Sequence, residues 1–114
     1  MILIDSTVIV GFLDADDALH EAVRARLKRL GPTRLLAASV ISYAEVLAGA
    51  ALGHHDGGRV QRFFDAVIAE LLPVDRAVAA CAARLRGRNA ALRLPDALIL
   101  ATAEEFVRSG RQRP

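Results

Sequence analysis

Three short apolar runs, separated by long stretches of helical pattern, constrain the fold of this chain more than any other feature. The runs are Ile2 to Ile4, Leu35 to Ser39 and Leu72-Pro73-Val74, and their aliphatic and β-branched residues predict short buried strands. Two helical segments follow each run, so the expected element order is β-α-α-β-α-α-β-α-α. Strands separated by helices pair in parallel with right-handed crossovers. We therefore expect a layered α/β fold.

Apolar residues at helical spacing mark the segments between these runs. Leu19, Val23, Leu27 and Leu30, for example, share one helix face. The first two expected helices are residues 7–13 and a helix that is capped by Asp16 or Asp17 and ends at Gly31-Pro32. The next two run from Ser42 to about Leu52 and from Asp56 onward, the latter with Val60, Phe63, Phe64, Val67 and Leu71 facing inward. The last two are a helix that is capped by Asp75 and reaches about Gly87, and a helix that begins at Pro95-Asp96. No repeat or linker interrupts the pattern, so we expect one domain over residues 1–114.

The composition excludes several classes of protein. The chain has 114 residues, 54% of them hydrophobic and 25% charged, which suffices for one core and excludes intrinsic disorder. No uncharged apolar run is long enough to span a membrane, and the N-terminal segment lacks the basic region of a signal peptide. The single cysteine, Cys81, excludes an intrachain disulfide and a cysteine-based zinc site. These features favour a cytoplasmic protein.

Three acidic residues stand where one edge of the sheet is expected. Asp5 directly follows the first strand, Glu45 lies early in the helix after the second strand, and Asp96 begins a later helix. Ligands of parallel sheets bind at the carboxyl ends of the strands. Converging carboxylates repel one another unless a cation neutralises them, and Mg²⁺ or Mn²⁺ prefers oxygen ligands. Each acid also has a structural interpretation: Asp5 and Asp96 as helix N-caps, and Ser42-x-x-Glu45 as a capping box.

The segments around these acids resemble the PIN-domain family, and most closely the VapC toxins of bacterial toxin–antitoxin pairs. The three motifs are MILIDSTVI (residues 1–9), SVISYAEVLAG (39–49) and LPDALILATA (94–103). They are similar to the family in order and spacing over about residues 1–105, and residues 106–114 form a divergent tail.

The resemblance implies a three-layer α/β/α domain and a metal-dependent endoribonuclease. Such an enzyme hydrolyses RNA, forms a homodimer and is neutralised by a cognate antitoxin protein. Asp5, Glu45 and Asp96 match the catalytic, metal-binding acids of the family, with Mg²⁺ or Mn²⁺ as the cofactor. Thr7 matches a small hydroxyl residue that would support a metal ligand or its water.

Net charge is divided unevenly along the chain, and its basic part is all arginine. Residues 1–75 carry 7 basic and 10 acidic side chains, whereas residues 76–114 carry 8 arginines and 3 acids. Arg88 and Arg93 come just before the third motif, where we expect them to contact RNA phosphates. Arg84 and Arg86 equally fit a solvated helix face, and a GC-rich gene would also replace lysine by arginine throughout.

The chain departs from the family at its C-terminal end. Relatives usually continue into a fourth strand and a fourth acid, whereas the residues after Ala103 contain no apolar run able to form a strand. We expect Glu104 and Glu105 inside the last helix and the final strands to be missing. One side of Ile2 to Ile4 would then be open to a partner. The alternative function is therefore a weakened or inactive PIN-domain remnant that still binds an antitoxin.

Overall fold

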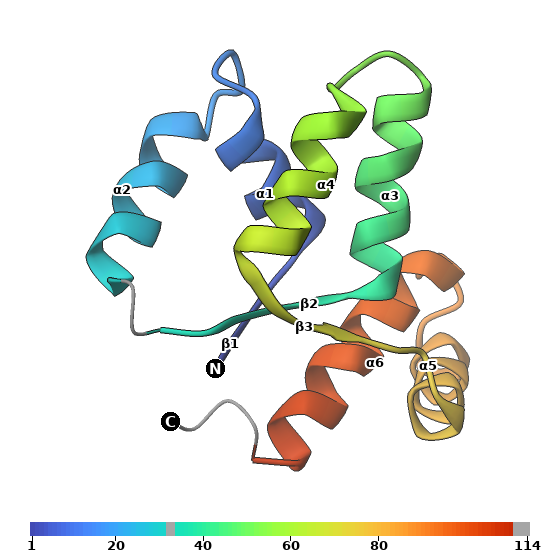
Figure 1. Ribbon diagram of the computed structural model, residues 1–114. Helices are drawn as coiled ribbons and strands as arrows, with labels where there is room; N and C mark the ends of the chain where they lie inside the picture. The colour runs from blue at the N-terminus through green and yellow to red at the C-terminus, as the bar shows by residue number, and fades with distance from the viewer. Residues whose placement is uncertain (32–33, 111–114) are drawn as a thin grey trace.

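The computed structural model describes residues 1–31 and 34–110 (Figure 1). Along the chain its elements are β1 (Ile2–Ile4), α1 (Ser6–Leu13), α2 (His20–Leu30), β2 (Leu36–Ser39), α3 (Val40–Ala51), α4 (Gly57–Ala66), β3 (Ile68–Leu72), α5 (Arg76–Arg88) and α6 (Leu94–Arg108). This is the element order that the sequence predicts. No helix in the described ranges is both long and apolar enough to cross a membrane.

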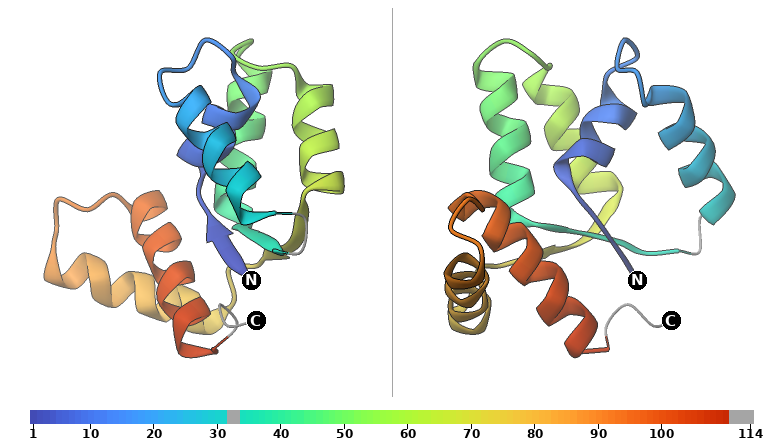
Figure 2. Two further views of the ribbon diagram at one scale, coloured as in Figure 1. Left: turned by 90° about the vertical axis from the view of Figure 1, so that its left-hand side faces the viewer. Right: turned by 180° about the vertical axis from the view of Figure 1, so that it is seen from behind.

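The sheet has β2 in the middle, with β1 and β3 paired to it in parallel. Ile2 aligns with Leu36 and Ile4 with Ala38 across the first pair. Helices α1 to α4 lie on one side of this sheet, and α5 and α6 lie on the other (Figure 2). The expected α/β class, with three layers and a short parallel sheet, is confirmed. Within the described residues, β1 pairs with β2 alone.

The larger core lies between the sheet and helices α1, α3 and α4. Its buried side chains are Ile4, Ile9, Leu13, Leu36, Ala38, Val46, Val60, Phe63 and Phe64. Aromatic rings concentrate here: the centroids of Phe12 and Phe63 are 5.3 Å apart, and those of Tyr43 and Phe64 are 4.6 Å apart. This packing holds in place the β1–α1 junction, where Asp5 lies, and helix α3, which carries Glu45.

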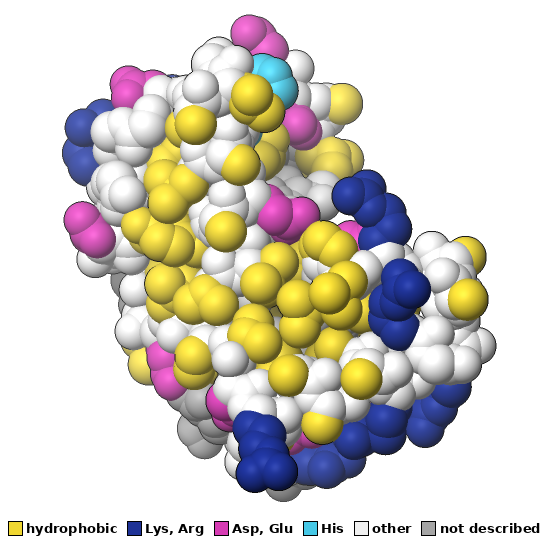
Figure 3. Space-filling model, turned by 90° about the vertical axis from the view of Figure 1, so that its right-hand side faces the viewer, with side chains coloured by type: hydrophobic (Ala, Val, Ile, Leu, Met, Phe, Trp, Pro, Cys, Tyr) yellow, Lys and Arg dark blue, Asp and Glu magenta, His cyan; other side chains and the backbone are white. Residues whose placement is uncertain are grey.

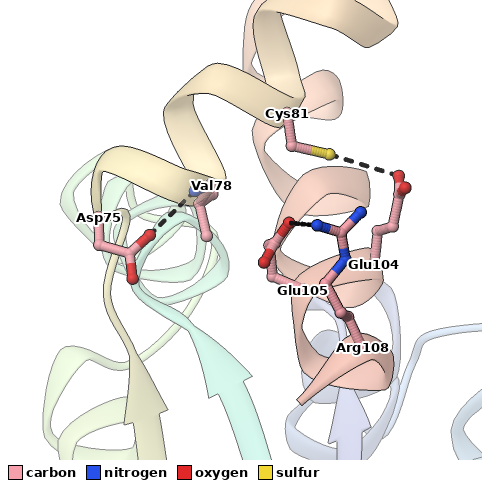
Figure 4. A network of polar contacts seen from close by, with 6 residues as sticks. All are labelled: Asp75, Val78, Cys81, Glu104, Glu105 and Arg108. Carbon is pink, nitrogen blue, oxygen red and sulfur yellow. Dashed lines mark hydrogen bonds and ion pairs between the residues drawn. The ribbon is translucent and has the colours of Figure 1, made fainter.

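The opposite face of the sheet is covered by α6. Phe106 is buried against Ala37 and Leu72, so one aromatic ring attaches the helix to two strands. Helix α5 packs in turn on α6 through a cluster of small and medium side chains: Val78, Cys81, Ala82, Ala97 and Ala101. Alanine at these positions lets the two helix backbones approach closely. Side-chain capping by Asp75, whose Oδ1 accepts from Val78 N–H at 2.9 Å, starts α5 as predicted (Figure 4).

The boundary between α4 and β3 differs from the sequence-based expectation. The helix ends at Ala66 instead of continuing to Leu71, and the strand is Ile68–Leu72 instead of Leu72–Val74. Apolar spacing is compatible with either structure over such a short run. Parallel pairing with β2 decides the outcome, because backbone groups of residues 68–72 bond to the middle strand.

Helix α2 also begins later than predicted. Its N-cap is Leu19, which makes no side-chain capping bond. The carboxylates of Asp14 and Asp17 instead accept from the N–H groups of Asp16 (2.9 Å) and Leu19 (2.8 Å), respectively. Short aspartate side chains often stabilise turns in this way. Gly31 ends the helix with a positive φ of 77°, whereas Pro32 lies outside the described residues.

Phe106→Ala should lower the free energy of unfolding by about 3–5 kcal/mol, because it removes the ring that joins α6 to the sheet. Urea denaturation followed by circular dichroism measures this change. Val107→Ala is the matched control on the same helix: Val107 is 54% exposed, and its truncation should change stability by less than about 0.5 kcal/mol. Equal losses in the two variants would contradict the proposed attachment of α6.

Candidate functional site

Asp5 occupies the junction between β1 and α1. Its side chain caps α1, with Oδ1 accepting from Val8 N–H at 3.0 Å, so the structural interpretation of this residue is correct. The carboxylate is nevertheless exposed and has no ion-pair partner among the described residues. One side chain can therefore start the helix and still present an oxygen to solvent. Thr7 is the second residue of the same helix and is also exposed.

Glu45 lies in the second turn of α3. Helix α3 begins at Val40 and is capped by Ser39, whose Oγ accepts from Ile41 N–H at 3.0 Å. The capping box proposed for Ser42 and Glu45 is therefore wrong, because both residues lie inside a helix that already has a cap. Glu45 is exposed and makes no ion pair within the described part of the chain.

Asp96 lies in the first turn of α6 and is exposed. The N-cap is Arg93, without a side-chain capping bond, so the interpretation of Asp96 as the cap is wrong. A carboxylate in the first turn is still favoured there by the helix dipole. Helix α6 contacts α3, which brings the elements carrying Asp96 and Glu45 together.

A pocket of about 280 Å³ lies between β1, α3 and α6, at the edge of the sheet where Asp5 is located. It is lined by Leu3, Ile4, Asp5, Val8, Ser39, Ser42, Ile99, Leu100 and Ala103. Figure 3 shows the molecule from the side of α3, α5 and α6, where acidic side chains lie in a hollow with basic side chains on its rim. Apolar surface continues from this hollow across the lower part of the molecule.

The three predicted acids fit a divalent cation in their donor chemistry. Asp5, Glu45 and Asp96 are exposed carboxylates without ion pairs in the described ranges, and Mg²⁺ prefers such oxygens. Within residues 1–31 and 34–110, however, no three aspartate, glutamate, histidine or cysteine side chains lie close enough to hold one ion. The convergence of these three carboxylates on one cation therefore stays a prediction.

Arginines surround the loop that leads into α6. Arg88 ends α5 and Arg93 precedes α6, and both are exposed. Arg86 differs from them, because its guanidinium donates to the carbonyl of Leu92 at 2.8 Å and braces the loop. The two interpretations considered for Arg86, phosphate contact and a solvated face, did not include this structural role. The positions of Arg88 and Arg93 are compatible with the predicted phosphate contacts.

Glu104 and Glu105 each bond to another side chain. Glu104 Oε2 accepts from the thiol of Cys81 on α5 at 3.3 Å, and Glu105 pairs with Arg108 at 3.8 Å (Figure 4). Neither residue lines the pocket that contains Asp5. Glu104 is therefore bonded to α5 and Glu105 to a residue of its own helix, both away from that pocket.

Sequence reasoning missed one residue of this site, Ser42. Ser42 was considered only as part of a capping box, yet it is fully buried and lines the pocket. Its spacing from buried Val46, one helical turn later, is the signal that places it on the inward face.

Burial raises the pKa of the Cys81 thiol, and its hydrogen bond to Glu104 and the charge of that carboxylate raise it further. The folded state thus favours the protonated thiol, and this stabilisation is lost as pH rises above about 8.5, the ordinary thiol range. Unfolding free energies measured between pH 8 and pH 10 should therefore fall more steeply in the wild type than in Cys81→Ala. Parallel pH profiles for the two proteins would contradict this linkage.

Comparison with known proteins places this geometry in a family. A model of the PIN domain matches residues 2–106. FitAcB from Neisseria gonorrhoeae is 28% identical with a TM-score of 0.74, over 94% of this chain and 83% of that chain. A toxin–antitoxin complex from Klebsiella pneumoniae gives 24% identity and a TM-score of 0.73, over 93% and 80%.

The toxin VapC20 from Mycobacterium tuberculosis, described as cleaving the sarcin–ricin loop, is 18% identical with a TM-score of 0.73 over 96% of this chain and 84% of that chain. A search of curated proteins finds no match. The family model nevertheless spans all three strands and nearly all of α6. The chain therefore belongs to the PIN-domain family.

Proposed function

We propose that this protein is a VapC-like, metal-dependent endoribonuclease that hydrolyses phosphodiester bonds in RNA. The observation that carries the proposal is the exposed carboxylate of Asp5 at a pocket formed by β1, α3 and α6, the three elements that bear or adjoin the predicted acids. Membership of the PIN-domain family and the likeness to toxin–antitoxin structures support a nuclease toxin.

The chemistry follows from the side chains at this edge. Asp5, Glu45 and Asp96 would hold Mg²⁺ or Mn²⁺, which when bound acidifies a water and offsets charge on a phosphate. Thr7, the second residue of α1, would orient a ligand near Asp5 through its hydroxyl. Arg88 and Arg93 would attract the RNA backbone to an otherwise acidic site, since opposite charges steer a polyanion toward it.

We further propose a cognate antitoxin as the protein partner and a homodimer as the assembly. The antitoxin is supported by a structural neighbour that is a toxin–antitoxin complex. The apolar surface near the site supports association: Leu100 on α6 is 51% exposed, and a pocket of about 460 Å³ lies between β1 and α2. We place the protein in the cytoplasm, where its RNA substrate is found.

One observation favours the alternative of an inactive remnant that binds an antitoxin. No three candidate ligands lie together in the described ranges, and Glu104 and Glu105 are engaged away from the pocket. A remnant would retain the fold and its apolar surfaces without a functional cation site. Direct measurement of metal binding separates the two proposals.

RNA cleavage should require the predicted acids. With Mn²⁺ present, the purified protein should cut RNA, and Asp5→Asn or Asp96→Asn should lower the rate at least about 100-fold, because each removes a charged cation ligand. Asp65→Asn is the matched control, since Asp65 is an exposed aspartate on α4, far along the chain from these motifs. Undiminished cleavage by Asp5→Asn would reject the site.

Calorimetry with Mn²⁺ provides a readout that does not depend on the RNA substrate. A nuclease should bind the ion at a defined site that Asp96→Asn weakens, because the substitution removes a charged ligand. The remnant should bind no ion with either sequence, while its thermal unfolding remains cooperative. Binding that survives in Asp96→Asn would remove that residue from the ligand set.

A further inference from the structure

Ser42 is the one buried side chain whose polar atom lacks a hydrogen-bond partner in the described part of the chain. Its exposed fraction is 0%. The other buried hydroxyls are satisfied: Ser39 Oγ accepts from Ile41 N–H, and Thr102 Oγ1 donates to the carbonyl of Leu98 at 2.8 Å. An unsatisfied hydroxyl destabilises a folded protein, so its presence calls for a role outside packing.

The position of Ser42 connects it with Asp5. Both residues line the pocket of about 280 Å³ between β1, α3 and α6. A water molecule takes about 30 Å³ in the liquid, so several fit in such a space. Most of the remaining wall is apolar, including Leu3, Ile99 and Leu100, and offers water no competing partner. The polar side chains in this wall are Asp5, Ser39 and Ser42.

Asp5 retains an oxygen that can take part in this arrangement. Its Oδ1 accepts from Val8 N–H, whereas Oδ2 makes no hydrogen bond within the described residues. A carboxylate with a single partner on one oxygen can still rotate about its terminal bond. A second donor on Oδ2 would restrict that rotation and fix the direction in which the charge is presented.

We propose that Ser42 is a positioning residue for Asp5. Its hydroxyl donates to a water molecule inside the pocket, and this water donates to Oδ2 of Asp5. The inference rests on the proposed function, because the orientation of Asp5 matters for the reaction only if its carboxylate binds the cation. A water that bridges two polar groups is nearly as favourable in enthalpy as a direct hydrogen bond, and the entropy lost on fixing it is modest.

A crystal structure of the wild-type protein without added metal tests the arrangement directly. The expected result is an ordered water within hydrogen-bond distance of both Ser42 Oγ and the Asp5 carboxylate. The same crystals of Ser42→Ala should lack this water or show it displaced. A wild-type structure in which Ser42 donates to a backbone carbonyl, with no water between it and Asp5, would overturn the proposal.

Mn²⁺ affinity and stability measured on the same variants separate positioning from packing. Ser42→Ala should weaken Mn²⁺ binding about 10-fold, as removal of a group that orients a metal ligand does. Its urea midpoint should not fall, because the substitution removes an unsatisfied hydroxyl. Ser42→Thr, which keeps the hydroxyl, should retain most of the affinity. Ser109→Ala is the control, since Ser109 Oγ bonds to the Phe106 carbonyl at the far end of α6.

The outcomes distinguish this inference from the proposed function. A wild-type protein that binds no Mn²⁺ and cuts no RNA would contradict the proposed function, and the crystal structure would still decide whether the water is present. A wild-type protein that binds Mn²⁺ no better than Ser42→Ala would overturn the positioning role alone. A lower urea midpoint with unchanged affinity would assign Ser42 to packing.

Discussion

The parallel pairing of β2 with both of its neighbours is the interaction on which the remaining structure depends. All four residues of this strand are buried, and two of them are alanines, Ala37 and Ala38, which face opposite layers. Their small side chains let helices pack closely on both faces of a sheet only three strands wide. Because α3 begins directly after Ser39 and β1 aligns with β2, the same register places Asp5 near the start of α3.

Much of this architecture is predictable from sequence, since it depends on signals that are local. The apolar run ending at Asp5 and the Asp75 cap are read correctly because neighbouring residues determine them. The limits of β3 are not, because residues 68–72 become a strand only through their bonds to β2. The supposed capping box failed for a local reason: Ser39, three residues earlier, already caps α3 and leaves Ser42 inside the helix.

The candidate site, too, is predictable from the sequence only in part. Sequence motifs place three acids on elements that meet at one region of the sheet edge, and the structure brings α3 and α6 into contact there. How the carboxylates point depends on charge, solvent and bound ions, which no spacing rule includes. The environment of Ser42 was likewise invisible, because its lack of a partner results from three elements separated widely in sequence. The engagement of Glu104 by Cys81 requires knowledge of how α5 lies on α6.

The buried side chains of this small domain form separate clusters, and the predicted acids lie on elements that belong to different clusters. Asp5 and Glu45 belong to elements held by the larger cluster around Ile9 and Val46, whereas Asp96 belongs to the α5–α6 pair with its own cluster. The ring of Phe106 is a main connection between the two parts. Separate clusters can open with different free energies. The predicted acids therefore lie on separately packed parts of the molecule, and a ligand that bridged them would hold those parts together.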